Sequence, residues 1–281
     1  MVSGSDSRCG EGDGKEVESE TPISLYHQIR GSGPSLVLVH GFAGSARNFR
    51  PQVKYFAEAH RVLTYDARGH ARSPAPSAPD AYSMDWLVSD LWGLLEREGF
   101  SEPVVLCGLS MGASTALHFA LAHPERVHAL VLASYPPGPE DPDGLSVRAE
   151  AFAQEIDQHG VEAAGSRFVW GPESGVAPEM AAQVRAGFLE HTPQGLAGVL
   201  RGVMARNPGP ADLSEPLART RLPVLLIEGE RDEASRRAAH ALAAGNPRVE
   251  SCVIPDAGHV CNLDQPALFN EALSSFIAEW G

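Results

Sequence analysis

Short apolar runs and longer amphipathic segments follow one another along most of this chain. The short runs are rich in β-branched residues, and they predict buried strands near residues 23–29, 35–39, 61–66, 103–108, 128–134, 223–228 and 249–254. The longer segments predict helices near residues 48–58, 81–98, 111–122, 234–244 and 265–279. Because strands alternate with helices, we expect an α/β fold with a doubly wound, mostly parallel sheet.

An insert interrupts this alternation between the Pro-rich segment 135–139 and Leu222. Three apolar stripes at helical spacing predict helices there, and most of their side chains are expected to pack the helices together: Leu196, Val199, Leu200, Val203 and Met204; Met180, Val184 and Phe188; and Val147, Phe152 and Ile156. Thr192 followed by Pro193 is typical of a helix N-terminus. We therefore expect a helical cap at residues 137–217, with hinges at 136–144 and 207–210, on a core formed by residues 21–136 and 218–281.

Residues 1–20 contain mainly Gly, Ser, Asp and Glu, which predicts a disordered acidic tail. This segment lacks the basic and apolar regions of a secretory signal, and no apolar run reaches the roughly 18 residues of a membrane span. The four cysteines, at positions 9, 107, 252 and 261, lack the spacing of a metal site or a disulfide framework, so we expect reduced thiols. These features predict a cytoplasmic protein.

The chain has 281 residues, a formal net charge of −14 and an isoelectric point near 5.2. Its length allows a single domain with a large core. A negative charge of this size repels polyanions, and no large cluster of Lys and Arg in the sequence offsets it. We therefore expect no nucleic-acid partner and no membrane partner, while the sequence leaves the oligomeric state open.

One serine stands at a predicted strand-to-helix turn. The segment Gly108-Leu109-Ser110-Met111-Gly112 follows a short apolar run and precedes an Ala- and Leu-rich segment that ends before Pro124. The two glycines remove the Cβ atoms that would collide in such a sharp turn, which leaves the hydroxyl of Ser110 exposed above the sheet. In this setting the pattern predicts a nucleophile elbow, with Ser110 as the nucleophile.

A serine hydroxyl is a weak nucleophile at neutral pH, so the elbow predicts a general base and a carboxylate that orients this base. Asp232 and His259 each stand just past a predicted strand, at the edge where catalytic groups gather in a parallel sheet. Their order after Ser110 is the order expected for this architecture. The other histidines stand too early in the chain, in the predicted cap or on a helix.

Four other carboxylates compete with Asp232 for the role of the acid: Glu228, Glu230, Glu233 and Asp256. Asp256 stands only three residues before His259 on the same loop, too close to orient the imidazole from behind. The remaining acidic neighbours are interpreted as solvated loop charges. Asp232 is therefore the predicted acid.

The chain carries two further motifs, at residues 36–45 (LVLVHGFAGS) and 62–73 (VLTYDARGHARS). Together with the elbow and the late Asp and His segments, they resemble the α/β-hydrolases over roughly residues 23–281, and small bacterial esterases and lactonases of the enol-lactonase type in particular. The resemblance implies a helical cap inserted after the sixth strand of the family. That strand is the one predicted at 128–134 here, because the family's additional N-terminal strand is not visible.

In this family the oxyanion hole is formed by backbone N–H groups. One donor is expected at Met111, directly after the nucleophile and at the start of a helix whose dipole favours negative charge. The second is expected at Phe42, after the His-Gly pair. His40 and Arg68 are expected to brace loops, although Arg68 could also line the pocket. The sequence contains no metal-binding HExxH or HxxEH motif, and no Gly-rich nucleotide loop follows a predicted strand. We therefore expect no metal and no cofactor.

A serine nucleophile argues against the family's dehalogenases and epoxide hydrolases, which need a carboxylate nucleophile. The loop at residues 40–44 differs from the HGGPG loop of proline iminopeptidases, and Ser114 replaces the basic residue that relatives in menaquinone synthesis carry. The expected function is a serine hydrolase that cleaves a small-molecule carboxylic ester or lactone by two-step acyl transfer. A thioesterase, a C–C bond hydrolase and a slowly hydrolysing ligand receptor are the alternatives.

The apolar stripes of the insert favour an uncharged or weakly polar substrate. Among the large apolar side chains of the insert, Trp170 is the one expected to bind substrate. It precedes Gly171 and Pro172, which end any helix and could turn the indole toward the cleft. The alternative is that Trp170 packs the cap onto the core.

Overall fold

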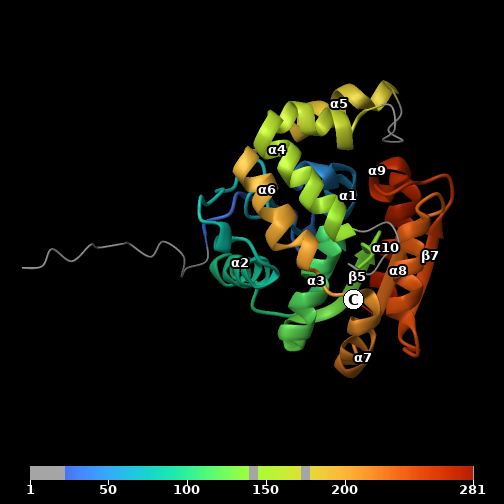
Figure 1. The fold of residues 1–281 in the computed structure, drawn as a ribbon. Helices are drawn as coiled ribbons and strands as arrows, with labels where there is room; N and C mark the ends of the chain where they lie inside the picture. Colours follow the sequence, from blue (N-terminus) through green and yellow to red (C-terminus); the bar gives the residue numbers. More distant parts are fainter. Residues whose placement is uncertain (1–22, 139–144, 172–177, 281) are drawn as a thin grey trace, which may run out of the picture.

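The computed structural model describes residues 23–138, 145–171 and 178–280 (Figure 1). The expected tail at residues 1–20 and residues 139–144 of the first expected hinge lie outside the described residues.

The described strands form one sheet with the order β1-β3-β2-β4-β5-β6-β7. They are β1 (His27–Arg30), β2 (Ser35–Val39), β3 (Arg61–Tyr65), β4 (Val104–Leu109), β5 (Val127–Ala133), β6 (Val224–Gly229) and β7 (Val249–Ile254). β1 runs antiparallel to β3, and all other neighbours are parallel. Each strand overlaps its predicted segment, so the predicted doubly wound α/β fold is confirmed.

Helices cover both faces of the sheet, which is why β4 and β6 are buried along their whole length. One face carries α2 (Met84–Arg97), α3 (Met111–Ala122) and α8 (Glu233–Ala243). The other face carries α1 (Arg50–Phe56), α9 (Cys261–Asp264) and α10 (Pro266–Trp280). The short 3-10 helices are η1 (Ala46–Phe49), η2 (Pro79–Ala81), η3 (Pro124–Arg126) and η4 (Met204–Arg206). Because β2 and β4 to β7 are parallel, the loops that follow them meet at one edge.

The insert follows β5, the fifth strand of this chain and the sixth of the family pattern. It contains α4 (Leu145–Phe168), α5 (Pro178–Phe188) and α6 (Pro193–Gly202), which gather at the top of the view in Figure 1. Thr192 caps α6 as predicted, because its hydroxyl accepts a hydrogen bond from the N–H of Gly195 at 3.2 Å. The three helices share an apolar cluster of their own, which the side chain of Phe42 contacts from the core.

The apolar stripe predicted for α4 is wrong at its first position. Val147 is 74% exposed, whereas Ala149, Ala153 and Ile156 are buried. The buried face carries two alanines where α4 packs against α6, so a pattern based on large side chains misses this face. The backbone of Gly160 has a positive φ of 82°, which kinks α4 between Leu145 and Phe168.

The last helix of the insert, α7 (Pro210–Thr220), packs against α8 and α3 of the core. Its first eight residues belong to the segment predicted as cap. The exact division of the chain into cap and core stays a prediction.

Candidate active site

Ser110 stands in the turn between β4 and α3, with backbone angles φ 55° and ψ −118°. A positive φ is costly for a residue with a side chain, and it is held here by close packing on both sides. A Cβ on Gly112 would lie 2.1 Å from the carbonyl oxygen of Val39 in β2. A Cβ on Gly108 would lie 2.1 Å from the carbonyl oxygen of Gly112. The two glycines therefore allow α3 to begin directly against the sheet.

A chain of two hydrogen bonds joins Ser110, His259 and Asp232. The imidazole Nε2 of His259 lies 2.9 Å from the hydroxyl oxygen of Ser110, and its Nδ1 lies 2.6 Å from a carboxylate oxygen of Asp232. Because a carboxylate accepts, Nδ1 donates and Nε2 keeps a lone pair for the serine proton. The structure thus brings together the three side chains that the sequence singled out, from the ends of β4, β6 and β7.

Among the three hydrogen-bonded side chains, that of His259 is the most exposed to solvent. The side chain of His259 is 48% exposed and that of Asp232 is 10% exposed, while Ser110 is buried apart from 8% of its surface. The nucleophile is therefore shielded, and the base lies next to water.

Asp232 holds its position through a second hydrogen bond. Its other carboxylate oxygen accepts from the N–H of Ser235 at 3.2 Å, which makes Asp232 the N-cap of α8. Burial works to raise the pKa of the Asp232 carboxyl, but the hydrogen bonds from His259 and Ser235 outweigh burial and lower it. The carboxyl is therefore ionised at neutral pH, as the orienting acid must be.

The prediction that the carboxylates near Asp232 are solvated loop charges is wrong for Glu228. This residue lies in β6 and is 2% exposed. Its Oε1 has no hydrogen-bond partner among the described residues. Burial raises the pKa of Glu228 to about 8, so it is mainly neutral at pH 7. Glu230 and Asp256 are exposed and contact each other, since the Glu230 carboxylate accepts from the N–H of Asp256. Among the five carboxylates considered, only Asp232 has a recorded contact with the imidazole of His259, whose Nδ1 also lies 3.5 Å from the hydroxyl oxygen of Ser235.

The loop after β2 lies directly against the nucleophile. A Cβ on Gly41 would lie 3.2 Å from the Cβ of Ser110, so a larger residue here would require the elbow to shift by a few tenths of an ångström. Phe42 follows Gly41, and Met111 follows Ser110 as the first residue of α3. The N–H of Phe42 and the N–H of Met111 donate no hydrogen bond recorded for the described residues. Both N–H groups therefore remain available for an oxyanion beside Ser110.

His40 connects this loop to the segment that follows β3, and Arg68 connects that segment to α2. The Nδ1–H of His40 donates to the carbonyl of Gly41 at 2.8 Å, and its Nε2 accepts from the N–H of Ala67 at 2.9 Å. Burial lowers the pKa of His40 to about 4, which keeps the ring neutral for this pair of bonds. Arg68 is buried and binds both carboxylate oxygens of Asp90 at 2.7 Å. Of the two roles considered for Arg68, the structure shows the brace.

A row of aromatic side chains leads from the loop into the cap. The ring centroids of Phe42 and Phe152 are 5.9 Å apart, those of Phe152 and Phe188 are 6.0 Å apart, and those of Phe188 and Trp170 are 5.5 Å apart. Trp170 is half-buried and packs against Gly165, where a Cβ would collide with the indole at 2.0 Å. Phe152 is the cap side chain next to Phe42, and Trp170 stands at the far end of the row.

Two buried histidines near the loop after β2, His70 and His191, were not singled out from the sequence. The ring of His70 lies 5.1 Å from the ring of His40 and 5.3 Å from that of His191, between centroids. His191 reaches from the cap to the core, since its Nε2 lies 3.0 Å from the carbonyl oxygen of Gly44. Local sequence carries no signal for this contact, because it joins residues that are 147 positions apart.

Among the described residues, no group of three or more His, Cys, Asp or Glu side chains could hold a metal ion. In the same part of the chain, Cys107, Cys252 and Cys261 are free thiols; Cys9 lies outside it. None of the described helices is long and apolar enough to cross a membrane.

Comparisons with known proteins agree with this architecture. A family model described as "Alpha/beta hydrolase family" matches residues 36–272. A candidate 2-succinyl-6-hydroxy-2,4-cyclohexadiene-1-carboxylate synthase of Bacillus subtilis (strain 168) is 31% identical over 90% of this chain and 95% of its own length. A protein named 3-oxoadipate enol-lactonase 2, from Acinetobacter baylyi, is 24% identical over 93% of this chain and 96% of its own.

Among solved structures, a thermophilic esterase from Thermogutta terrifontis superimposes with a TM-score of 0.78 at 27% identity. The match covers 92% of this chain and 94% of the esterase.

Proposed function

The chain belongs to the alpha/beta hydrolase family and is a hydrolase, and on that basis we propose that it cleaves a carboxylic ester or a lactone through Ser110, His259 and Asp232. The hydrogen-bonded chain from Ser110 to Asp232 is the observation that carries this proposal. We propose further that the substrate is a small molecule, that no metal or cofactor takes part, and that the protein acts in the cytoplasm without nucleic-acid or membrane partners.

In the first step, the Ser110 oxygen attacks the substrate carbonyl while Nε2 of His259 takes the hydroxyl proton. Asp232 holds the tautomer in which Nε2 is free, and it stabilises the imidazolium that forms. Negative charge develops on the carbonyl oxygen, where the N–H groups of Phe42 and Met111 would receive it. One such donor typically contributes about 2.7–4 kcal/mol to lowering the barrier.

The tetrahedral intermediate then collapses to the acyl-enzyme: the bond from the carbonyl carbon to the alcohol oxygen breaks, that oxygen takes the proton of the His259 imidazolium, and the acyl group stays on Ser110. In a lactone, this oxygen remains tethered to the acyl group. Water then attacks the acyl-enzyme with His259 as the base, the bond between the acyl carbon and the Ser110 oxygen breaks, and His259 returns the proton to that oxygen as the acid leaves. The exposure of the His259 side chain supports this step, because water reaches the imidazole without a large rearrangement.

The surroundings of the elbow favour an uncharged acyl or alcohol group. The row that begins at Phe42 and Phe152 is aromatic, and the neighbouring His40 ring is neutral. Aromatic side chains bind apolar groups through burial of a large surface. This supports an ester or lactone with an apolar substituent in preference to a charged substrate.

A synthase reaction is the second candidate, because the Bacillus subtilis relative is 31% identical over most of both chains. At the fourth position past the nucleophile, this chain has Ser114, which is 2% exposed and accepts a hydrogen bond from the Asn207 amide at 3.1 Å. No cation stands at that position to bind an anionic substrate. We therefore rank ester and lactone hydrolysis above the synthase reaction.

The test is a substrate panel together with trapping of the acyl-enzyme. p-Nitrophenyl esters of rising chain length, lactones, an acyl thioester, a diketone and the synthase reaction are assayed with the same preparation. We expect steady turnover of esters or lactones and an acyl adduct on the Ser110 peptide after an acid quench. Turnover confined to the thioester, the diketone or the synthase reaction would contradict ester or lactone hydrolysis and assign the reaction that is observed instead. A single burst with little steady state would indicate a ligand receptor.

A further inference from the structure

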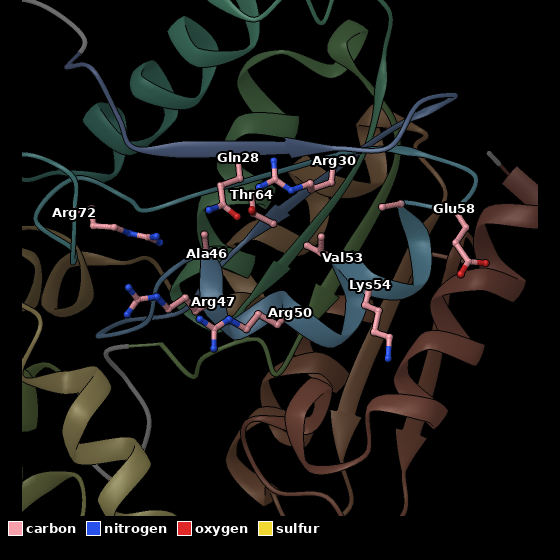
Figure 2. Close-up of a pocket in the computed structure, with 11 residues that line it drawn as sticks. Gln28, Arg30, Ala46, Arg47, Arg50, Val53, Lys54, Glu58, Thr64 and Arg72 are labelled. Atoms are coloured by element: carbon pink, nitrogen blue, oxygen red, sulfur yellow. The ribbon is translucent and has the colours of Figure 1, made fainter.

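A pocket of about 430 Å³ lies at the β1 edge of the sheet, and none of the triad residues line it. Figure 2 shows its two walls, with Gln28, Arg30 and Thr64 on the strands and Arg47, Arg50 and Lys54 on the helical side. The strand wall comes from β1 and β3, and the helical wall from η1 and α1. The volume falls in the range typical of small-molecule sites, which is roughly 300–1,000 Å³.

The lining of this pocket is positively charged on a chain whose net charge is −14. Two of its arginines already have carboxylate partners: Arg47 pairs with Glu190 of the cap loop, and Arg72 binds Asp66 through two hydrogen bonds at 2.7 and 2.9 Å. Their charges are therefore largely neutralised.

Three further cations of the pocket have no ion pair with any described residue: Arg30, Arg50 and Lys54. Arg30 donates only to the backbone carbonyl of Ile29. Glu58, in the turn after α1, is the single carboxylate of the lining, and no recorded ion pair joins it to Lys54. The three side chains come from two separate elements, so the fold brings an excess of positive charge to one place.

The floor between these cations is not charged. It contains the apolar side chains of Ala46 and Val53, with the hydroxyl of Thr64 and the amide of Gln28 beside them. Such a floor accepts the carbon skeleton of an organic molecule and offers it hydrogen bonds. Guanidinium groups bind phosphate and carboxylate oxygens in pairs, and a lysine ammonium adds a point charge.

We propose that this pocket is a second ligand site, which binds a small organic molecule carrying two or more negative charges as phosphate or carboxylate groups. The site is separate from the triad, and it does not depend on the reaction that the triad performs. The unpaired cations supply the attraction, and the apolar floor selects a compact organic anion over a simple salt ion.

Calorimetric titration at low ionic strength tests the site, with pyrophosphate and citrate as separate probes. We expect saturable binding of at least one probe, and the tighter probe indicates whether the ligand carries phosphate or carboxylate groups. Binding of neither probe would overturn the proposal. The double variant R30Q/R50Q should weaken binding roughly tenfold or more, because each arginine contributes charge-assisted hydrogen bonds. Melting temperature checks that both proteins are folded.

The single variants R30Q and R50Q are measured as well, and Arg97→Gln is their matched control: it also removes one positive charge, from an exposed arginine in the last turn of α2 outside the pocket. We expect this control to bind the probe as the wild type does. An equal loss of binding in R97Q and in either pocket variant, R30Q or R50Q, would show a general charge effect and overturn the site.

Lys54 allows a second, independent readout, because the chain contains only one other lysine, Lys15. Pyridoxal 5′-phosphate followed by borohydride reduction attaches a phosphorylated label to accessible lysines. We expect faster labelling of the Lys54 peptide than of the Lys15 peptide, and protection of Lys54 by the tighter probe. Equal labelling of both peptides without protection would contradict the proposal.

Discussion

At the scale of single residues, Asp232 contributes to both folding and chemistry. One of its oxygens binds the imidazole of His259, and the other caps α8 through the N–H of Ser235. The carboxylate is thus held by the helix as well as by the histidine. This arrangement explains why a residue in a loop can orient a base that is 27 positions away.

Asp232→Asn should lower kcat for a p-nitrophenyl ester by about 10⁴, by analogy with the serine-protease triad, because an amide favours the wrong tautomer of His259. The cap of α8 is kept, since asparagine is also a good N-cap. Asp256→Asn is the control on the neighbouring loop, and we expect it to change kcat far less. A larger loss in Asp256→Asn than in Asp232→Asn would show that the acid is assigned to the wrong residue.

Glu228 makes stability depend on pH. Burial raises the pKa of Glu228 to about 8 from an ordinary value of 4.5, so the folded chain keeps a proton that the unfolded chain releases. The contribution of this residue to stability is therefore fully present below pH 4.5 and is lost as pH rises through about 8. Glu228→Gln removes this loss, because glutamine stays neutral.

Urea unfolding across that pH range checks the prediction for Glu228. As pH increases, we expect the free energy of unfolding of Glu228→Gln to rise relative to that of the wild type. Parallel curves for the two proteins would mean that the carboxyl is ionised in the folded state. The activity of Glu228→Gln should remain close to that of the wild type, since Glu228 does not contact His259.

At the scale of secondary structure, the inner strands β2, β4 and β5 follow from the sequence because each contains a continuous apolar run that needs no distant information. The elbow follows for a related reason, since a strand, two glycines and a helix are neighbours in sequence. The first turn of the α4 stripe was wrong because Val147 lies on the exposed side, and small residues form the buried face. The burial of Glu228 was not predicted either: the strand predicted at 223–228 includes it, but a carboxylate next to further acidic residues is typical of a solvated loop.

The elbow depends on close contact between β2, β4 and α3. Gly112→Ala should lower the free energy of unfolding by about 1–3 kcal/mol or more, because the new Cβ would meet a backbone oxygen of β2. Gly187→Ala is the matched control in α5, where a Cβ would meet nothing within 4 Å. Alanine favours a helix over glycine, so this control should be neutral or stabilising. Equal destabilisation of the two variants in urea would contradict the packing account.

The cap helices should set the preference for substrate length. Phe152→Ala should reduce kcat/KM for long-chain esters more than for acetate, because Phe152 contacts Phe42 beside the elbow and remote contacts are lost. Trp170→Ala should show the same trend if the indole reaches the substrate. If Trp170 only packs the cap, its replacement lowers the melting temperature and reduces kcat/KM for all esters by a similar factor. An unchanged length profile in both variants would contradict an aromatic substrate pocket.

At the scale of the whole molecule, catalytic side chains from distant segments of the sequence lie together at one edge of the sheet. Ser110, Asp232 and His259 span 150 positions of the chain, yet two hydrogen bonds join them, because parallel strands end together. The order of the three motifs along the sequence predicts that these side chains lie together. Contacts that depend on how the cap docks, such as Phe42 with Phe152 or Gly44 with His191, carry no local signal. The basic pocket at the β1 edge is equally invisible in the sequence, since its cations come from separate segments.

The hydrolysis rate of Ser110→Ala tests the central claim most directly. Without the hydroxyl, His259 and Asp232 have no nucleophile to activate, so kcat for p-nitrophenyl butyrate should fall by roughly 10⁵–10⁶. The circular dichroism spectrum should stay unchanged, because alanine fits the space of serine. Turnover within about tenfold of the wild type, in a preparation free of contaminating esterase, would contradict the assignment of Ser110 as the nucleophile.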